Sequence, residues 1–352
     1  MKRLTILLFM LAACSSPDDI NIGGIFMLTG PAATHGKDSA QAAELAINEI
    51  NQAGGINGRL LAWEVDDTKS ADAKTSVTVL TRFINKDINV VIGPTWSNTA
   101  KAMAPIACSE HIILMSPTAG VAFNEECEYL FALRPHDEVL NEKFGRHIYQ
   151  QGHKTLAIVG STQAWEEEQA RAVKKGFEGA GGTVVSFQLP QLMEQDYRTE
   201  ATKVKAVNPD AIVFTNSAGQ QTLARRLKEL GVTTPFYSVL VYHETLETHN
   251  GFMEGTIVNT DFTPSTVFVA KFEQAYNRTP DIGADTSYDA IMLLAGAMRT
   301  TGSVEPEDLQ VHLNALQEYT GESGYLVFDG KGGVSKEATQ KKIQGKELVA
   351  LS

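Results

Sequence analysis

The sequence predicts an α/β protein with two similar lobes, each built on a parallel sheet that helices cover. Short apolar runs alternate with segments whose apolar residues recur at helical spacing, which is typical of parallel sheets with helices on both faces. The alternation occurs in two series, separated by a break near Pro135. The chain has 352 residues, more than one hydrophobic core usually supports, so two lobes are expected.

The first series begins at the apolar run 20–26 and continues with a predicted helix over residues 38–53. Gly54 and Gly55 are expected to end that helix, because glycine accepts the left-handed conformation found at helix ends. The other predicted elements of this series are the strands 60–65, 90–92 and 112–115 and the helices 71–84 and 99–108.

The second series begins at the apolar run 156–159 and a predicted helix over 166–180, which Gly181 and Gly182 end. Further strands are predicted at 184–189, 211–214 and 255–261, with helices at 199–207 and 220–230. Residues from about 265 return mainly to helices, including 287–298. The tail from residue 324 is predicted to form two short strands around a turn at 329–333.

The N-terminus has the features of an export signal. Lys2 and Arg3 precede an almost uninterrupted apolar stretch up to Ala13, which is too short for the roughly 20 residues that span a bilayer. Cys14 follows small residues, an arrangement that resembles the bacterial lipoprotein box. On this interpretation residues 1–13 are a signal peptide, Cys14 is lipidated and residues 14–19 form a polar tether. A plain signal peptide with an incidental cysteine is the alternative.

Composition and charge exclude some classes of function. Hydrophobic residues make up 43% of the chain and charged residues 20%, as in ordinary packed domains. The formal net charge is −12, which argues against a nucleic-acid partner, because nucleic-acid-binding proteins display basic faces.

Cys108 and Cys127 are the two remaining cysteines. In an oxidising compartment they are predicted to form a disulfide, and two separate buried thiols are the alternative. Neither a CxxC pair nor a nearby histidine cluster accompanies them, so we expect no zinc or other metal site and no cofactor.

Several segments spread over the chain carry a resemblance to a known family. They are LTGPAATHGKDSAQAAELAINEINQAGGINGRLL, VVIGPTWSNTA, HIILMSPTA, LFALRP and SYDAIMLLAGAM. Together they resemble the branched-chain amino-acid (Leu/Ile/Val)-binding proteins of ABC importers, which are type I periplasmic binding proteins. The resemblance implies two Rossmann-like lobes joined by three crossover segments, near residues 136–139, 261–265 and 328–331. Lobe 1 would contain residues 20–136 and 265–328, and lobe 2 residues 137–264 and 329–352.

Two polar loops are candidates for ligand binding, since ligands bind at the carboxyl ends of parallel strands. The first loop follows the predicted strand 90–92, and the second follows the predicted strand 112–115. The hydroxyl residues of the first loop stand where a helix is predicted to start, so capping of that helix is an alternative to ligand binding. The resemblance assigns Ser97 to the ligand carboxylate, and Ala119 and Gly120 to a loop whose backbone binds carboxylate and amine. The family often has a hydroxyl residue where Gly120 stands, and Thr118 is expected to replace it.

Further contacts are expected from the rest of the predicted cleft. By resemblance, Trp165 covers the ligand from the second lobe and His35 lies at the pocket mouth. A packed position for Trp165 and an exposed loop position for His35 are the alternatives. Asn216 and Ser217 end a predicted strand that faces the cleft, where they are expected to hydrogen-bond the ligand.

The chain departs from the family at one position. Amino-acid binders of this family carry an acid that pairs with the ligand ammonium, and here residues 239–241 are Val, Leu and Val. An unpaired buried ammonium is costly, so either the ligand lacks an amine or another acid replaces the missing one. Asp285 is the first candidate, followed by Glu244 and Glu166. An exposed surface carboxylate is the alternative for each.

No catalytic motif is apparent, and the chain is not expected to be an enzyme. The segment His243 to His249 lacks the second histidine that an H-E-x-x-H zinc motif requires at position 247. Residues 330–333 lack the glycine and hydroxyl spacing of a phosphate-binding loop.

The sequence therefore predicts a lipid-anchored, extracytoplasmic solute-binding protein of an ABC transporter. It would capture a small carboxylate-bearing solute, an amino acid or a relative, by closing its lobes, and deliver it to a membrane permease. It would work in the periplasm or at the cell surface, attached to the membrane only through Cys14. A sensor or regulatory lipoprotein that binds an amide, a urea-like compound or an aromatic acid is the alternative, and a structural lipoprotein with an empty cleft is a third hypothesis.

Overall fold

The computed structural model describes residues 19–30, 33–69, 72–191 and 194–351. Among these residues, no helix combines the length and the apolar character that a membrane crossing requires. Cys14, the predicted signal peptide and most of the predicted tether lie outside the described residues.

The first lobe contains a five-stranded, fully parallel sheet in the order β2-β1-β3-β4-β5. Its strands are β1 (Ile20–Phe26), β2 (Leu61–Asp67), β3 (Val90–Ile92), β4 (Ile113–Ser116) and β5 (Leu130–Ala132). Helices α1 (Ala33–Gln52), α2 (Ala73–Ile84), α3 (Ser97–Ser109), α9 (Thr266–Tyr276), α10 (Ala284–Thr301) and α11 (Pro306–Asn314) accompany it. The central strands read as continuous apolar runs because both faces are buried: Ile92 contributes to one hydrophobic cluster and Val91 to another.

A small antiparallel sheet completes the first lobe. It consists of β11 (Glu318–Gly321), β12 (Gly324–Phe328) and β13 (Val334–Ser335). Leu326 and Val334 from this sheet belong to the same buried cluster as residues of α1 and α10.

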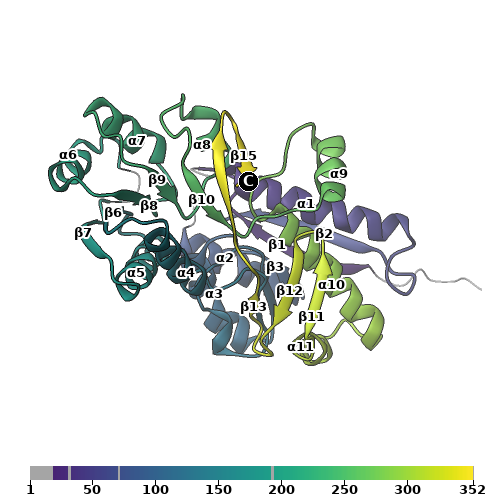
Figure 1. Cartoon of the computed structure of the whole chain (residues 1–352). Helices are drawn as coiled ribbons and strands as arrows, with labels where there is room; N and C mark the ends of the chain where they lie inside the picture. Colours follow the sequence, from purple (N-terminus) through teal and green to yellow (C-terminus); the bar gives the residue numbers. More distant parts are fainter. Residues whose placement is uncertain (1–18, 31–32, 70–71, 192–193, 352) are drawn as a thin grey trace, which may run out of the picture.

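The second lobe contains a seven-stranded sheet in the order β15-β14-β10-β9-β8-β6-β7. Five of its strands are parallel, namely β6 (Thr155–Val159), β7 (Thr183–Gln188), β8 (Ala211–Phe214), β9 (Phe236–Ser238) and β10 (Ile257–Thr260). The antiparallel strands β14 (Thr339–Gln344) and β15 (Glu347–Ala350) extend one edge. The helices are α4 (Asp137–Gln150), α5 (Ala164–Gly179), α6 (Arg198–Val207), α7 (Gln220–Glu229) and α8 (His243–Thr248). Figure 1 shows this lobe beside the first, which confirms the predicted α/β class with two lobes and parallel sheets.

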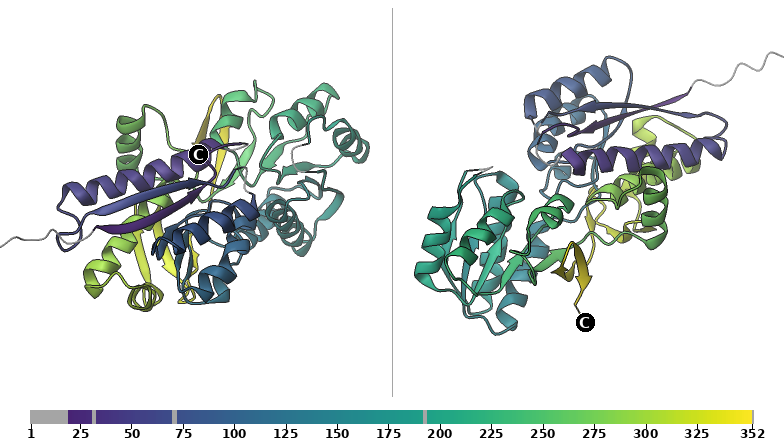
Figure 2. Two further views of the ribbon diagram at one scale, coloured as in Figure 1. Left: turned by 180° about the vertical axis from the view of Figure 1, so that it is seen from behind. Right: turned by 90° about the horizontal axis from the view of Figure 1, so that it is seen from above.

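The chain passes between the two lobes three times, from β5 to α4, from β10 to α9 and from β13 to β14. Figure 2 shows the lobes as two bodies that these segments join in the middle. The third passage comes later than the expected 328–331. Because β13 pairs with β12, residues 334–335 stay with the first lobe, and the chain crosses between Ser335 and Thr339.

A disulfide joins Cys108, near the end of α3, to Cys127, which directly follows the short 3₁₀ helix η1 (Asn124–Glu126). The two Cα atoms are 5.9 Å apart. The two cysteines are therefore paired as the sequence predicts, and they are not separate thiols.

Candidate ligand-binding site

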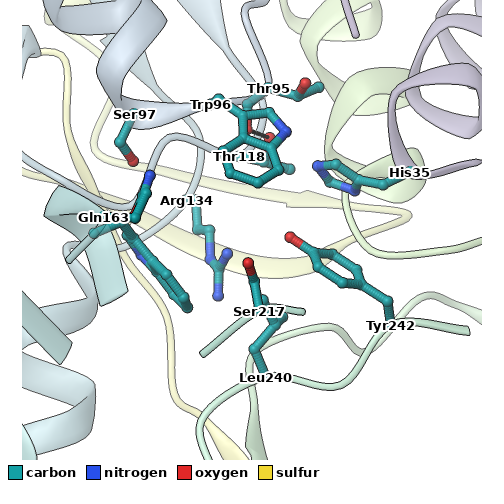
Figure 3. Close-up of a pocket in the computed structure, with 11 residues that line it drawn as sticks. His35, Thr95, Trp96, Ser97, Thr118, Arg134, Gln163, Ser217, Leu240 and Tyr242 are labelled. Carbon is teal, nitrogen blue, oxygen red and sulfur yellow. Dashed lines mark hydrogen bonds between the residues drawn. The ribbon is translucent and has the colours of Figure 1, made fainter. Parts of the chain in front are cut away.

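Side chains from both lobes line one opening, which we call the interlobe opening. Its volume is about 380 Å³, counted together with solvent at its mouth. Figure 3 shows the residues that line it: His35, Thr95, Trp96, Ser97, Thr118, Arg134, Gln163, Trp165, Ser217, Leu240 and Tyr242. Most of them follow the carboxyl ends of β3, β4, β6, β8 and β9, where parallel sheets leave a crevice for ligands.

The N-terminus of α3 forms one side of the opening. Ser97 is the first residue of this helix, and its hydroxyl points into the opening (Figure 3). Trp96 occupies the N-cap position and makes no side-chain cap hydrogen bond. The N–H groups of a helix start and the helix dipole attract anions, so this side of the opening favours a negatively charged group.

The loop after β4 places only one of its three predicted ligand residues in the opening. Thr118 lines it, and its hydroxyl donates to the carbonyl of Thr95 at 2.8 Å. The N–H of Ala119 donates to the Ser116 hydroxyl at 3.0 Å, so this backbone donor is used within the protein. A Cβ on Gly120 would lie 2.0 Å from Asp137 Oδ2, so Asp137 fills the space that a side chain at position 120 would need.

Trp165 lines the opening from the second lobe, where it is held by a buried network. Its indole N–H donates to Asp137 Oδ2 at 2.6 Å. Nη2 of Arg134 lies 3.3 Å from Asp137 Oδ1 and 3.2 Å from Asp261 Oδ1. Burial raises the pKa of Asp137 to about 7, against the attraction of Arg134. Burial also opposes the charge on Arg134, but the two carboxylates hold its pKa above the ordinary value, so the guanidinium is charged.

His35 lies in the first turn of α1 and not in an exposed loop, because α1 begins at Ala33, earlier than predicted. The side chain is buried, and burial lowers its pKa to about 4, so the ring is neutral at pH 7. Its ring centroid is 5.4 Å from that of Tyr242, which comes from the second lobe. This ring pair joins the two lobes at the edge of the opening.

None of the three acids considered as ammonium partners lines the interlobe opening. Asp285 lines a neighbouring space, the side opening, together with Thr118, Arg134 and Asp261; its volume is about 210 Å³, counted together with open solvent. Its Oδ1 accepts from the N–H of Thr286 at 2.8 Å, and Oδ2 has no hydrogen-bond partner among the described residues. Burial raises the pKa of Asp285 to about 7.

The other two acids are placed elsewhere. Glu166 is buried beneath Ser217, whose N–H donates to Glu166 Oε1 at 2.8 Å, and burial raises the pKa of this carboxyl. Glu244 is exposed on α8. Leu240 stands in the segment where the family acid was expected, and it lines the opening with an apolar side chain.

Asn216 is buried and does not line the opening, and its amide donates to the carbonyl of Ala218 at 2.6 Å. The next residue, Ser217, lines the opening. Six of the lining residues were not among the predicted ligand-binding residues: Thr95, Trp96, Arg134, Gln163, Leu240 and Tyr242. Arg134 was visible only as part of the segment LFALRP, and nothing local in the sequence distinguishes a buried arginine from an exposed one.

Three lining residues carry a buried polar atom that lacks a hydrogen-bond partner within the described part of the chain. They are Thr95 through Oγ1, Trp96 through Nε1 and Arg134 through Nε. Buried polar groups are nearly always hydrogen-bonded in proteins, so such a group of atoms indicates a place for a polar molecule. In the described segments, no three His, Cys, Asp or Glu side chains gather closely enough to hold a metal ion.

Comparison with known proteins gives consistent matches over most of the chain. Residues 19–342 match a family model described as "Periplasmic binding protein". The chain is 25% identical over 326 residues to the leucine-, isoleucine-, valine-, threonine-, and alanine-binding protein of Pseudomonas aeruginosa, covering 90% of this chain and 87% of the relative. It is 27% identical over 330 residues to the Leu/Ile/Val/Thr-binding protein of Salmonella typhimurium, covering 90% and 88%.

Solved structures show the same fold. The branched-chain amino acid transporter substrate-binding protein LivJ of Streptococcus pneumoniae, in complex with isoleucine, superposes with a TM-score of 0.87 at 21% identity, covering 94% of this chain and 98% of that one. A solute-binding protein of an ABC transporter from R. palustris, in complex with benzoate, gives a TM-score of 0.86 at 19% identity, covering 95% of each chain.

Proposed function

This chain belongs to the periplasmic binding protein family, and on that premise we propose that it captures a small carboxylate-bearing solute between its lobes and delivers it to an ABC permease. The relatives are named as binding proteins and not as enzymes. The observation that carries the proposal is the interlobe opening, which combines the N-terminus of α3 with the charged side chain of Arg134. Both features stabilise a negative charge.

An amino acid is the first solute to test, because the names of the curated relatives describe binding of leucine, isoleucine and valine. A specific observation favours a second candidate, an acid without an ammonium group. None of the described residues that line the interlobe opening is Asp or Glu, and Trp96, Trp165 and Tyr242 supply aromatic surface. A sensor or regulatory protein that binds an aromatic acid would use the same opening.

A ligand panel followed by thermal unfolding tests the proposal. The panel contains amino acids, aromatic acids, amides and urea. We expect at least one carboxylate to stabilise the protein, by about 2.7 kcal/mol when its concentration is 100 times the dissociation constant. Stabilisation by neutral amides or urea alone would contradict the proposal, and so would recovery of a chemically altered solute.

We also propose that the mature protein is attached to the membrane through a lipid on Cys14 and works in the periplasm or at the cell surface. The support is the apolar stretch that precedes Cys14 and the small residues directly before it. Fractionation of cells that produce the Cys14→Ser variant tests this proposal. We expect the variant to appear in the soluble fraction and the wild type in the membrane fraction. Equal distribution of both would contradict the lipid anchor.

A further inference from the structure

The hydrogen-bond donors expected to bind the ligand carboxylate are largely used within the protein. The hydroxyl of Thr118 donates to Thr95, and the N–H of Ala119 donates to Ser116. Position 120 has no side chain, and the carboxylate of Asp137 fills the space where one would stand. A carboxylate in the interlobe opening therefore requires another strong donor in addition to Ser97.

Arg134 is such a donor. Its side chain is only 9% exposed, and Figure 3 shows it extending into the interlobe opening toward Ser217 and Tyr242. A guanidinium has five N–H donors. Both ion pairs of Arg134 use the same nitrogen, Nη2, while Nε has no hydrogen-bond partner in the described part of the chain. The guanidinium therefore keeps donors that its internal partners leave unused.

Arg134 is also the only cationic side chain among the described residues that line the interlobe opening. His35, the other basic residue there, is neutral at pH 7 because it is buried. The remaining lining side chains are uncharged. An ammonium in this space would meet a like charge, whereas a carboxylate would meet an opposite one.

We propose that Arg134 binds the carboxylate of the solute and is the main determinant of the preference for acids. This inference rests on the proposed function and names the residue that carries it. Arg134 lies on the first crossing segment, between β5 and α4, and its partner Asp261 lies on the second, between β10 and α9. A solute held by Arg134 therefore contacts the segments on which the lobes move, which couples occupancy to closure.

Matched acids and amides provide the test, because a structural role for Arg134 would affect both members of a pair equally. The probe pairs are leucine with leucinamide, 4-methylpentanoate with 4-methylpentanamide, and benzoate with benzamide. The measured quantity is the ratio of the two dissociation constants within each pair. In the wild type we expect the acid of at least one pair to bind more tightly. Arg134→Met is expected to reduce this ratio about 10- to 100-fold, the worth of a hydrogen bond to a charged group.

Three further variants keep the result interpretable. Arg134→Met leaves Asp137 and Asp261 without their cation, so Arg134→Met combined with Asp261→Asn restores part of the charge balance should the single variant fold poorly. Arg134→Lys keeps the positive charge but lacks the planar guanidinium with its fixed N–H donors. The ratio of the two dissociation constants should therefore fall less than in Arg134→Met. Ser97→Ala is the competing variant, since it removes the other donor expected to bind the carboxylate in the opening.

The outcomes separate this inference from the proposed function. An acid preference that persists in the Arg134 variants, or that disappears in Ser97→Ala alone, would overturn the role of Arg134 and leave the proposed function intact. Wild-type protein that binds no carboxylate of the ligand panel or of these pairs, or that prefers the amides, would overturn the proposed function itself.

Discussion

At the scale of single residues, an absent side chain shapes the candidate site. Gly120 leaves room for the carboxylate of Asp137, which accepts the indole N–H of Trp165 at 2.6 Å and lies 3.3 Å from Arg134. In the family that the sequence resembles, the residue at this position is often a hydroxyl residue that contacts the ligand. In this chain the same space belongs to a buried carboxylate that positions an aromatic ring and an arginine.

Gly120→Ala should destabilise the protein by about 1–3 kcal/mol, because the new Cβ would overlap Asp137 Oδ2 and approach the indole nitrogen of Trp165. Gly296→Ala is the matched control. Gly296 lies within α10 with nothing within 4 Å of a new Cβ, so the control should be stabilised by about 0.5–1 kcal/mol. Chemical denaturation measures both changes, and equal effects of the two substitutions would contradict the argument.

Asp285 should make stability depend on pH. Burial raises its pKa to about 7 in the folded protein, while the unfolded chain has the ordinary value near 4, and the attraction of Lys336 only partly opposes burial. The folded state therefore binds the proton more tightly. The stabilisation that the proton brings is complete below about pH 4 and is lost as the pH rises to about 7, with a slope of at most about 1.4 kcal/mol per pH unit.

The Asp285→Asn variant has no titrating carboxyl at this position, so its unfolding free energy should lack the pH dependence that Asp285 causes. We expect the unfolding free energy of the wild type, relative to the variant, to decrease between pH 4 and pH 7. Other carboxyl groups with raised pKa values, such as Asp137 and Asp281, are present in both proteins and cancel in the comparison. A difference that stays constant over this range would show that Asp285 titrates normally.

At the scale of elements, three helix starts converge on the interlobe opening. His35 lies in the first turn of α1, Ser97 begins α3 and Trp165 is the second residue of α5. Each of these helices follows a parallel strand, so its N-terminus lies at the carboxyl edge of a sheet. Ligands of such folds bind at this edge. The partial positive charge of three helix starts adds to that of Arg134 and favours an anionic solute.

The disulfide ties the end of α3 to the segment before β5 and should contribute about 3 kcal/mol, because it closes a loop between residues 19 positions apart. The double variant Cys108→Ala with Cys127→Ala should therefore unfold at lower denaturant concentration. Neither cysteine lines the interlobe opening, so solute affinity should stay unchanged in calorimetry. A large loss of affinity in the folded variant would show that the disulfide also positions α3 at the site.

At the scale of the whole molecule, apolar contacts join the lobes beside the interlobe opening. Val121 and Ile282 come from the first lobe, yet they belong to a hydrophobic cluster with Val239 and Leu240 of the second. These contacts and the ring pair of His35 and Tyr242 form only when the lobes approach each other. We therefore expect them to stabilise a closed arrangement of the lobes and not the fold of either lobe.

Ile282→Ala should weaken solute binding several-fold, because it removes cross-lobe contacts worth up to about 2 kcal/mol and shifts the population toward an open form. Small-angle scattering of the solute-free variant should give a larger radius of gyration than the wild type. Ile47→Ala is the control, since Ile47 is buried within the first lobe alone. It should lower stability without changing affinity or shape, and equal loss of affinity in both variants would contradict the argument.

The sequence by itself determined the class of fold, its duplication and the family. The runs at 90–92 and 156–159 are apolar because both faces of a parallel strand are buried, and this signal lies within each segment. Ser97, Thr118, Trp165 and His35 were also identified from the sequence, by resemblance, and they line the interlobe opening. Their roles toward a solute stay predictions. The strands β5 and β9 were not predicted, because each has only three residues and, unlike β3, neither is a run of β-branched residues.

Only the tertiary structure decided which polar groups meet. Arg134 and Asp261 are 127 positions apart in the chain, and the structure brings them to 3.2 Å on two crossing segments. The third passage between the lobes lies later in the chain than predicted, because β13 pairs with β12. Asp285 lines the side opening and not the interlobe opening. The physical reason is that hydrophobic periodicity is a local property, whereas the burial and pairing of a charge depend on residues that are distant in the chain.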